Sequence, residues 1–177
     1  MRITIKQNKM KKTILILFLA IGITAQAQIF DKDYNDKSYA YFSVGSSYAK
    51  TPHTNNFTPN GILTAGVFWN VFDISLNYEY VKLTPDYHSY YTQALVRPFT
   101  IRQFEFLVGA KYGRIIRGDE GTYNYLGGTG EVRWNFGDKW FISLQGNYDR
   151  RGDILYKWGN NSDYWKYTTH LKIGIKL

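Results

Sequence analysis

The chain has 177 residues, which fits one domain, and 18% of them are aromatic. It contains no cysteine, which excludes disulfides, thiolate metal sites, a cysteine nucleophile and a lipid-modified N-terminal cysteine. The net charge is +8, but five of the 22 basic residues and none of the 14 acidic ones lie in the first 27 residues. The rest of the chain has 17 basic residues against 14 acidic ones and no basic stripe. The charge therefore does not indicate nucleic-acid binding.

The N-terminus has the three parts of a secretion signal. Residues 6–12 are rich in lysine, residues 13–24 are apolar, and residues 25–27 read Ala-Gln-Ala, an A-x-A cleavage site. A retained anchor helix would need roughly 20 apolar residues, more than this run supplies. We therefore expect a cleaved signal peptide at 1–27, a short periplasmic segment at 28–38 and the folded domain at 39–177.

From residue 39 onward the apolar residues recur with a period of two, which is the pattern of β-strands. In the clearest case, Phe72, Ile74 and Leu76 alternate with Asp73 and Ser75. Each segment has about ten residues, the length that a tilted strand needs to cross a bilayer. The predicted strands are 39–48, 62–69, 72–80, 90–98, 104–112, 125–136, 140–151 and 167–177.

The connections between these segments alternate in length. Short ones fall at 70–71, 99–103 and 137–139, and longer polar ones at 49–60, 83–89, 116–121 and 150–163. Short turns at one end and long loops at the other are typical of outer-membrane barrels whose turns face the periplasm. The sequence therefore predicts an all-β fold, an eight-stranded antiparallel up-and-down transmembrane β-barrel.

The two faces of the predicted strands decide which side points outward. Eight strands enclose an interior just wide enough for side chains, and the apolar face is too rich in Tyr, Trp and Phe to fit there. The opposite face is small and polar, and a closed interior requires its charges to pair. The predicted lumen charge pairs draw on Asp73, Glu79, Arg97, Glu105, Lys111, Glu131 and Arg133.

The outward aromatic residues gather at the strand ends, as two interfacial girdles would. One girdle flanks the short turns and consists of Trp69, Phe72, Phe104, Phe136 and Trp140. The other lies near the long loops and consists of Tyr48, Tyr78, Tyr80, Tyr112, Tyr148 and Tyr167.

With these features the chain resembles the small eight-stranded outer-membrane barrels of the OmpA/OmpX type, from residue 39 to the end. The alternating apolar residues of the last strand, Tyr167, Leu171, Ile173 and Ile175, resemble the terminal signal that the barrel-assembly machinery reads, which makes that machinery an expected partner. The family signal usually ends in an aromatic residue, whereas this chain has Leu177. The resemblance implies a membrane protein and does not select one function, because members include structural proteins, adhesins and lipid-modifying enzymes.

Three features could carry chemistry. His170 faces the predicted lumen, where Glu131 or another acid could reach it, and we interpret it as a hydrogen-bonded histidine and not a catalytic one. Two Arg-Gly-Asp triplets, at 117–119 and 151–153, fit turn chemistry better than adhesion. Basic residues near the loop ends are candidate contacts for the phosphates of outer-membrane lipid and lipopolysaccharide: Lys50, Arg114, Arg117, Arg150 and Arg151.

We expect a structural or surface-interaction role through the extracellular loops, with a lumen filled by side chains and no open pore, cofactor, metal or nucleic-acid partner. The fourth long loop, with Ile154, Leu155, Tyr156 and Trp158, is the best candidate contact surface for an unknown partner. The alternatives are an outer-leaflet lipid-modifying enzyme, similar to a lipid A deacylase or acyltransferase, and a soluble periplasmic ligand-binding barrel.

Overall fold

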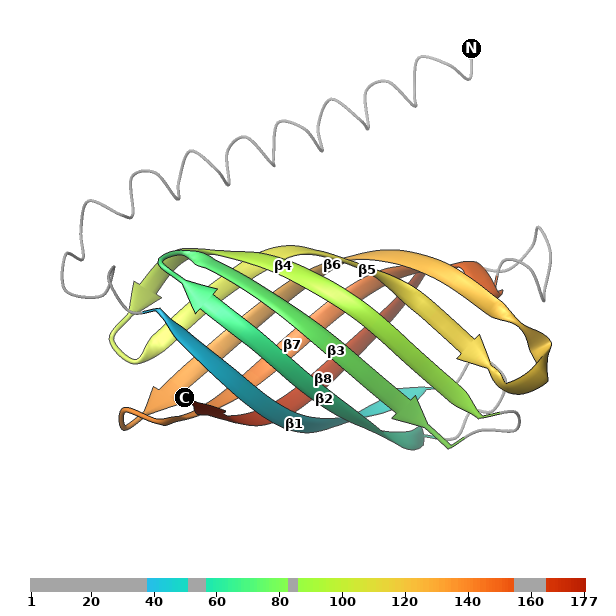
Figure 1. Cartoon of the computed structure of the whole chain (residues 1–177), viewed down its shortest axis with the longest axis horizontal. Helices are drawn as coiled ribbons and strands as arrows, with labels where there is room; N and C mark the ends of the chain where they lie inside the picture. Colours follow the sequence, from blue (N-terminus) through green and yellow to red (C-terminus); the bar gives the residue numbers. More distant parts are fainter. Residues whose placement is uncertain (1–37, 51–56, 83–85, 155–164) are drawn as a thin grey trace, which may run out of the picture.

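The protein is a closed barrel of eight antiparallel strands, each paired with its neighbours in chain order (Figure 1). The computed structural model describes residues 38–50, 57–82, 86–154 and 165–177, without the side chains of 48–50 and 57–59. The predicted signal peptide and most of the N-terminal segment therefore lie outside the described residues. The strands are β1 (Tyr39–Lys50), β2 (Phe57–Trp69), β3 (Phe72–Val81), β4 (Tyr87–Ile101), β5 (Phe104–Arg117), β6 (Thr122–Phe136), β7 (Trp140–Arg151) and β8 (Trp165–Lys176).

The predicted up-and-down topology is confirmed, and β1 closes the barrel against β8 with Val44 opposite Ile173. The three short turns lie at one end of the barrel, the turn end, together with Leu177 (Figure 1). Asn70, Arg102 and Gly137 adopt the left-handed backbone conformation there, with φ of 60°, 56° and 69°. Left-handed residues allow a chain to reverse within two or three residues.

The strands reach further toward the other end, the loop end, than the sequence predicts. β4, β5 and β6 begin or end three to five residues beyond the predicted limits. The predicted loop 116–121 shrinks to a single 3-10 turn (Gly118–Glu120), because β5 and β6 stay paired up to Ile116 and Thr122. Gly113 and Arg114 interrupt the apolar pattern of β5, so the sequence did not show this extension.

β4 contains a bulge at Pro98. The register with β5 shifts between Val96 and Phe99, so that one extra residue of β4 is left without a partner. Proline has no N–H to donate to the ladder, and bulges are where sheets accommodate it. The bulge leaves Arg97 buried and Phe99 exposed, so the inner side of the wall stays polar and the outer side stays apolar at this position.

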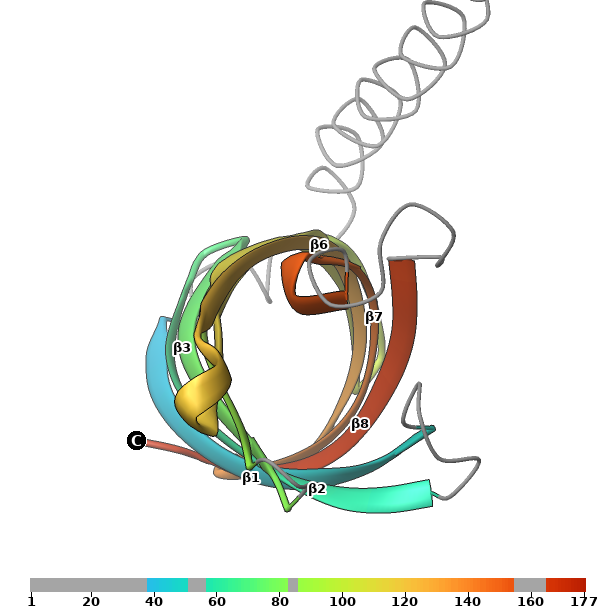
Figure 2. The same ribbon diagram turned by 90° about the vertical axis from the view of Figure 1, so that its right-hand side faces the viewer.

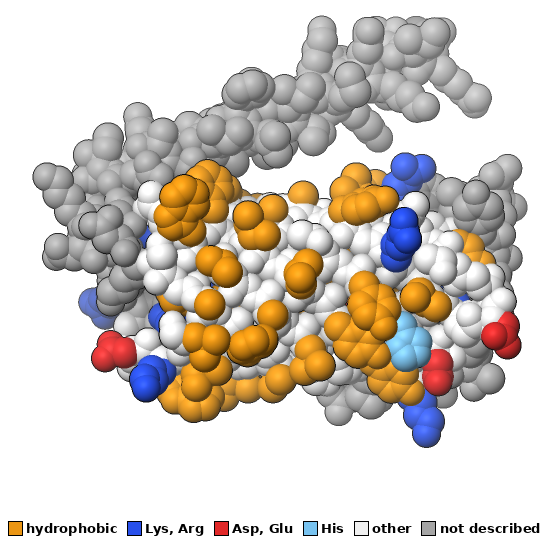
Figure 3. Space-filling model, viewed as in Figure 1, with side chains coloured by type: hydrophobic (Ala, Val, Ile, Leu, Met, Phe, Trp, Pro, Cys, Tyr) orange, Lys and Arg blue, Asp and Glu red, His pale blue; other side chains and the backbone are white. Residues whose placement is uncertain are grey.

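Hydrophobic side chains occur along the length of the barrel on the face shown in Figure 3. Leu76, in the middle of β3, is 67% exposed. Exposure of a large apolar side chain within an apolar surface has no cost when that surface faces lipid. Charged side chains on the visible face lie toward the two ends (Figure 3). Other aliphatic residues exposed on the outside include Val44, Leu63, Val67, Ile74, Leu144, Leu171 and Ile173. No helix within the described ranges is long and apolar enough to span a membrane.

The lumen is packed with larger side chains than the sequence interpretation assumed. An apolar cluster near the loop end combines aliphatic and tyrosine side chains, and a second one near the turn end joins Phe68, Leu95 and Leu107. The interior is therefore not only small and polar, and the interpretation was incomplete in this respect. The loop-end cluster consists of Ile62, Val81, Tyr87, Tyr91, Ile115 and Tyr125.

Candidate functional site

An ionic network surrounds Arg133, a fully buried residue of β6. One of its terminal nitrogens, Nη2, lies 3.0 Å from Asp73 Oδ2 and 3.0 Å from Glu131 Oε1. Lys172 of β8 places its Nζ 2.8 Å from Glu131 Oε2. These four residues, the central network, link β3, β6 and β8 across the interior, and a buried charge is tolerated when it is paired in this way.

Aromatic rings enclose the Arg133 guanidinium from two sides. Its carbon lies 4.8 Å from the centre of the Tyr41 ring and 4.7 Å from that of Phe141. Such cation–π contacts add to the ion pairs, because the ring faces are electron-rich. Space for the rings comes from glycines: a Cβ at Gly66 would overlap Tyr41, and one at Gly174 would overlap Phe141.

His170 belongs to a hydrogen-bonded polar layer next to the central network. Its Nδ1 lies 3.1 Å from Asn147 Nδ2, and its Nε2 lies 3.4 Å from Glu79 Oε1. The acidic neighbour is therefore Glu79, another acid than Glu131, which is the one that the sequence analysis named. The same Glu79 accepts a short hydrogen bond from Asn60. His170 is completely buried in the lumen.

Lys111 forms a separate buried pair closer to the loop end. Its Nζ lies 2.9 Å from Asp149 Oδ2 and 4.6 Å from the centre of the Tyr91 ring. Tyr125 lies on its other side, with its ring centre 5.4 Å from the same nitrogen. A cation, a carboxylate and two rings thus occupy this level of the lumen.

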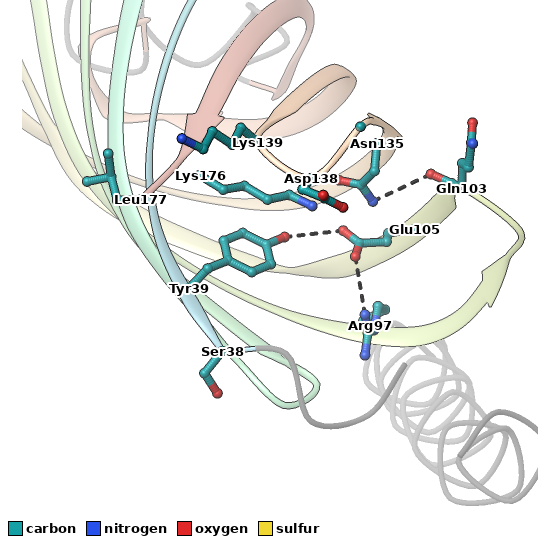
Figure 4. A pocket seen from close by; sticks show the side chains of 11 residues that line it. Ser38, Tyr39, Arg97, Gln103, Glu105, Asn135, Asp138, Lys139, Lys176 and Leu177 are labelled. Carbon is teal, nitrogen blue, oxygen red and sulfur yellow. Dashed lines mark hydrogen bonds and ion pairs between the residues drawn. The ribbon is translucent and has the colours of Figure 1, made fainter. Parts of the chain in front are cut away.

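The mouth at the turn end contains a cavity of about 700 Å³ that opens out of that end of the barrel (Figure 4). Its buried wall includes Arg97, whose Nη1 lies 3.2 Å from Glu105 Oε1, and Tyr39, whose hydroxyl donates to Glu105 at 3.4 Å. Asn135 donates weakly to the carbonyl of Gln103. The cavity is a vestibule that ends at the Arg97–Glu105 pair.

At the loop end, the chain turns inward after β7 and fills part of the barrel mouth (Figure 2). Asp153, in the helical turn 152–154, receives Arg117 Nη2 at 2.7 Å and Arg151 Nη2 at 2.8 Å. Tyr87 covers both guanidinium groups, with its ring centre 5.6 Å from Arg117 Cζ and 5.0 Å from Arg151 Cζ. We name these four residues the loop-end clamp.

The loop-end clamp corrects the sequence expectation for two arginines. Arg117 and Arg151 were expected to contact lipid phosphates, yet Arg117 is 4% exposed and both arginines pair with Asp153 inside the mouth. The prediction failed because a loop that folds back into the lumen offers its own carboxylate to them. The second Arg-Gly-Asp triplet is consequently closed off, since Asp153 is 1% exposed.

Charges of both signs lie in the lumen. Among the described residues, six carboxylates and five basic side chains are buried there together with His170, and the half-buried Arg151 pairs with Asp153. The arrangement can hold the wall rigid and obstruct passage, because an ion would have to displace paired groups along its path. No three described His, Cys, Asp or Glu side chains gather as metal ligands. The charged groups are Asp73, Glu79, Glu105, Glu131, Asp149 and Asp153, with Arg97, Lys111, Arg117, Arg133, Arg151 and Lys172.

On the outer surface, the structure places the girdle residues at both ends. Trp69, Phe72, Phe104 and Trp140 are exposed near the short turns, where Phe136 is half-buried. Toward the loops, Tyr112, Tyr148 and Tyr167 are exposed, and Tyr78 and Tyr80 are half-buried. Arg114 and Arg150 also point outward, whereas the side chains of Tyr48 and Lys50 lie outside the described ones.

Some interior residues escaped the sequence interpretation, although strand alternation could have located them. Tyr125 and Phe141 share the strand face of Gly127 and Ser143, which the pattern placed inside. Asp153 gave no such signal, because it lies beyond the end of β7.

No protein-family model and no curated protein matches this sequence. Solved structures match it in fold. The N-terminal β-barrel domain of Pseudomonas aeruginosa OprF aligns with a TM-score of 0.55 at 12% identity, covering 80% of this chain and 98% of that one. Neisserial surface protein A aligns with a TM-score of 0.55 at 14% identity, covering 79% and 96%. A de novo designed transmembrane β-barrel aligns with a TM-score of 0.50 at 11% identity, covering 78% and 95%. The chain therefore has the fold of the eight-stranded outer-membrane barrels.

Proposed function

We propose that this protein is exported to the outer membrane, where it is a non-enzymatic barrel that acts through its loop end. The observation that carries the proposal is the inversion of polarity: Leu76 is 67% exposed on the wall, whereas Arg133 is fully buried inside it. Such a molecule is stable with lipid around it and paired charges within. The closed ladder also leaves no strand edge unpaired in lipid.

The barrel is oriented with its turn end in the periplasm and its loop end outside the cell. Short periplasmic turns and longer outer connections support this orientation. β8, with outward Leu171 and Ile173, is the segment offered to the barrel-assembly machinery during insertion. The surrounding partner is outer-membrane lipid, including lipopolysaccharide, and the loop end contacts a surface partner.

The filled lumen supports a structural or interactive role over conduction. The central network and the loop-end clamp obstruct the interior at two levels, and eight strands leave little free space beside them. Lipid modification has no comparable support, because His170 and Glu79 face the interior and not the lipid.

The membrane assignment is tested by fractionating cells and running the protein in SDS with and without boiling. A closed barrel in the outer-membrane fraction should migrate faster before boiling, since SDS finds no open edge to attack. Recovery in the soluble periplasm with no heat-dependent shift would refute the proposal. In planar bilayers, the same sample should show no steady conductance, and a stable open channel would contradict the filled lumen.

A further inference from the structure

Four rings form a compact platform on the outside of the barrel near the loop end. Tyr78 and Tyr80 come from β3, and His88 and Tyr90 come from β4. Ring centres of Tyr78 and Tyr90 are 4.9 Å apart, and those of Tyr80 and His88 are 5.1 Å apart. We call these four residues the tyrosine–histidine platform.

The imidazole in this platform is oriented by a hydrogen bond. The Tyr78 hydroxyl lies 2.8 Å from His88 Nδ1, and the two rings stack with centres 6.0 Å apart. When this hydroxyl donates to Nδ1, the ring proton resides on Nε2, which is then a donor. No other described side chain engages Nε2, so this donor remains for an external acceptor.

A guanidinium lies next to the platform on the neighbouring strand. Arg114 of β5 is exposed and is paired in register with Tyr90, while His88 is paired with Ile116. Arg114 and His88 are therefore diagonal neighbours on one face, at a separation of about 7–8 Å that a long side chain can span. Asn124, opposite Arg114 on β6, is also exposed and adds an amide donor.

Other charges lie at this edge of the barrel. Lys82 and Asp86 are exposed at the adjoining ends of β3 and β4, and Asp119 and Glu120 are exposed in the 3-10 turn that follows β5. Arg114 is set back from that turn along β5, level with Tyr90 of the platform. Below the platform, the outer surface continues with Leu76 and Ile74, which are 67% and 58% exposed.

We propose that the tyrosine–histidine platform and Arg114 form a binding site for a phosphate-bearing lipid of the outer leaflet. The phosphate accepts hydrogen bonds from the Arg114 guanidinium and from His88 Nε2, and the acyl chains lie along the apolar wall of β3. Arginine suits this role because its planar group donates in pairs to phosphate oxygens. The tyrosine rings occupy the interfacial depth where such headgroups reside. This inference rests on the proposed outer-membrane function.

The test measures lipid binding to the purified full-length protein by native mass spectrometry. The protein in neutral detergent is titrated with a bis-phosphorylated glycolipid and with the same glycolipid after removal of its phosphates. We expect preference for the phosphorylated form and a dissociation constant about tenfold higher in R114Q, since charge-assisted hydrogen bonds are lost. H88Q should weaken binding several-fold, and R114K should restore part of the loss.

R102Q is the matched control, because Arg102 is also exposed but lies at the turn end. Unchanged binding in R102Q, with the loss in R114Q, supports the site. Equal affinity for the dephosphorylated lipid, or equal losses in R102Q and R114Q, would overturn it. Displacement of the lipid by millimolar inorganic phosphate would identify free phosphate as the ligand and overturn the lipid assignment. The heat-dependent gel shift of each variant reports barrel folding separately, so failure of this site does not imply failure of the membrane proposal.

Discussion

Arg117 Nη2 lies 2.7 Å from Asp153 Oδ2, so a guanidinium at the end of β5 holds a carboxylate that follows β7. Arg151 holds the same carboxylate through two nitrogens, each at 2.8 Å. Ile154, the next residue after Asp153, is 2% exposed as a result. This contact ties the outer connection of β7 to the mouth of the barrel.

Breaking the loop-end clamp should release the turn at 152–154. In D153N the charge that both arginines hold is lost, and hydrogen bonds to charged groups are worth about 1.5–3 kcal/mol. A cysteine at Ile154 should therefore react at least about tenfold faster with a membrane-impermeant maleimide. The chain contains no other cysteine, so the label reports this position alone.

Asp119 provides the control for this measurement. It ends the other Arg-Gly-Asp triplet and is exposed, so D119N should leave the labelling rate unchanged. Equal rates in the D153N and unmodified backgrounds would show that the carboxylate does not hold the turn.

The loop-end clamp should persist through mild acid. Burial alone would raise the pKa of Asp153, but the hydrogen bonds and charges of Arg151 and Arg117 outweigh it and lower the pKa to about 2. A lowered folded-state pKa gives stability that is present above the unfolded value and is lost as pH falls through about 2. Labelling at position 154 should thus stay constant down to pH 4, measured at matched thiolate concentration. A steep rise between pH 7 and 5 would contradict this.

Removing Arg133 should be the most damaging single change in the lumen. R133M leaves Asp73 without its ion-pair partner, and breaking one side of a buried pair costs about 3–5 kcal/mol. We expect a correspondingly lower urea midpoint for unfolding from lipid vesicles, followed by tryptophan fluorescence. R114Q, an exposed arginine, should shift stability by less than about 0.5 kcal/mol. Adding D73N to R133M should recover part of the loss, and no recovery would argue against the pairing.

Replacing glycine by alanine should have opposite effects on stability at two positions of the barrel. In G174A the new methyl group overlaps the Phe141 ring, and overpacking of this kind costs about 1–3 kcal/mol. In G130A the methyl group enters open space outside the barrel, and reduced flexibility of the unfolded chain should stabilise by about 0.4–1 kcal/mol. The difference is measurable as the temperature at which the unboiled band disappears. Equal behaviour of the two variants would mean that Phe141 does not lie over Gly174.

Local patterns predicted most of the wall and little of its interior contacts. Alternation predicted β3 within one residue, because Phe72 to Tyr80 shows each face without interruption. It placed Glu131 and Arg133 inside, but it could not join Lys172 to Glu131, since that contact depends on the curvature of the closed sheet. The inward position of Asp153 could not be predicted for a different reason: no periodic pattern continues past the end of β7.

The central network also has a consequence for how the barrel is made. Lys172 of β8 neutralises Glu131 of β6, while Arg133 of β6 reaches Asp73 of β3, so the pairing partners are not adjacent strands. When only the first seven strands are in place, Glu131 lacks its contact with Lys172, and the edges of β1 and β7 are still unpaired. Insertion of β8 closes the seam and brings Lys172 to Glu131 in one event. A barrel that lacks its final strand is therefore chemically distinguishable from a finished one, because it also lacks this ion pair.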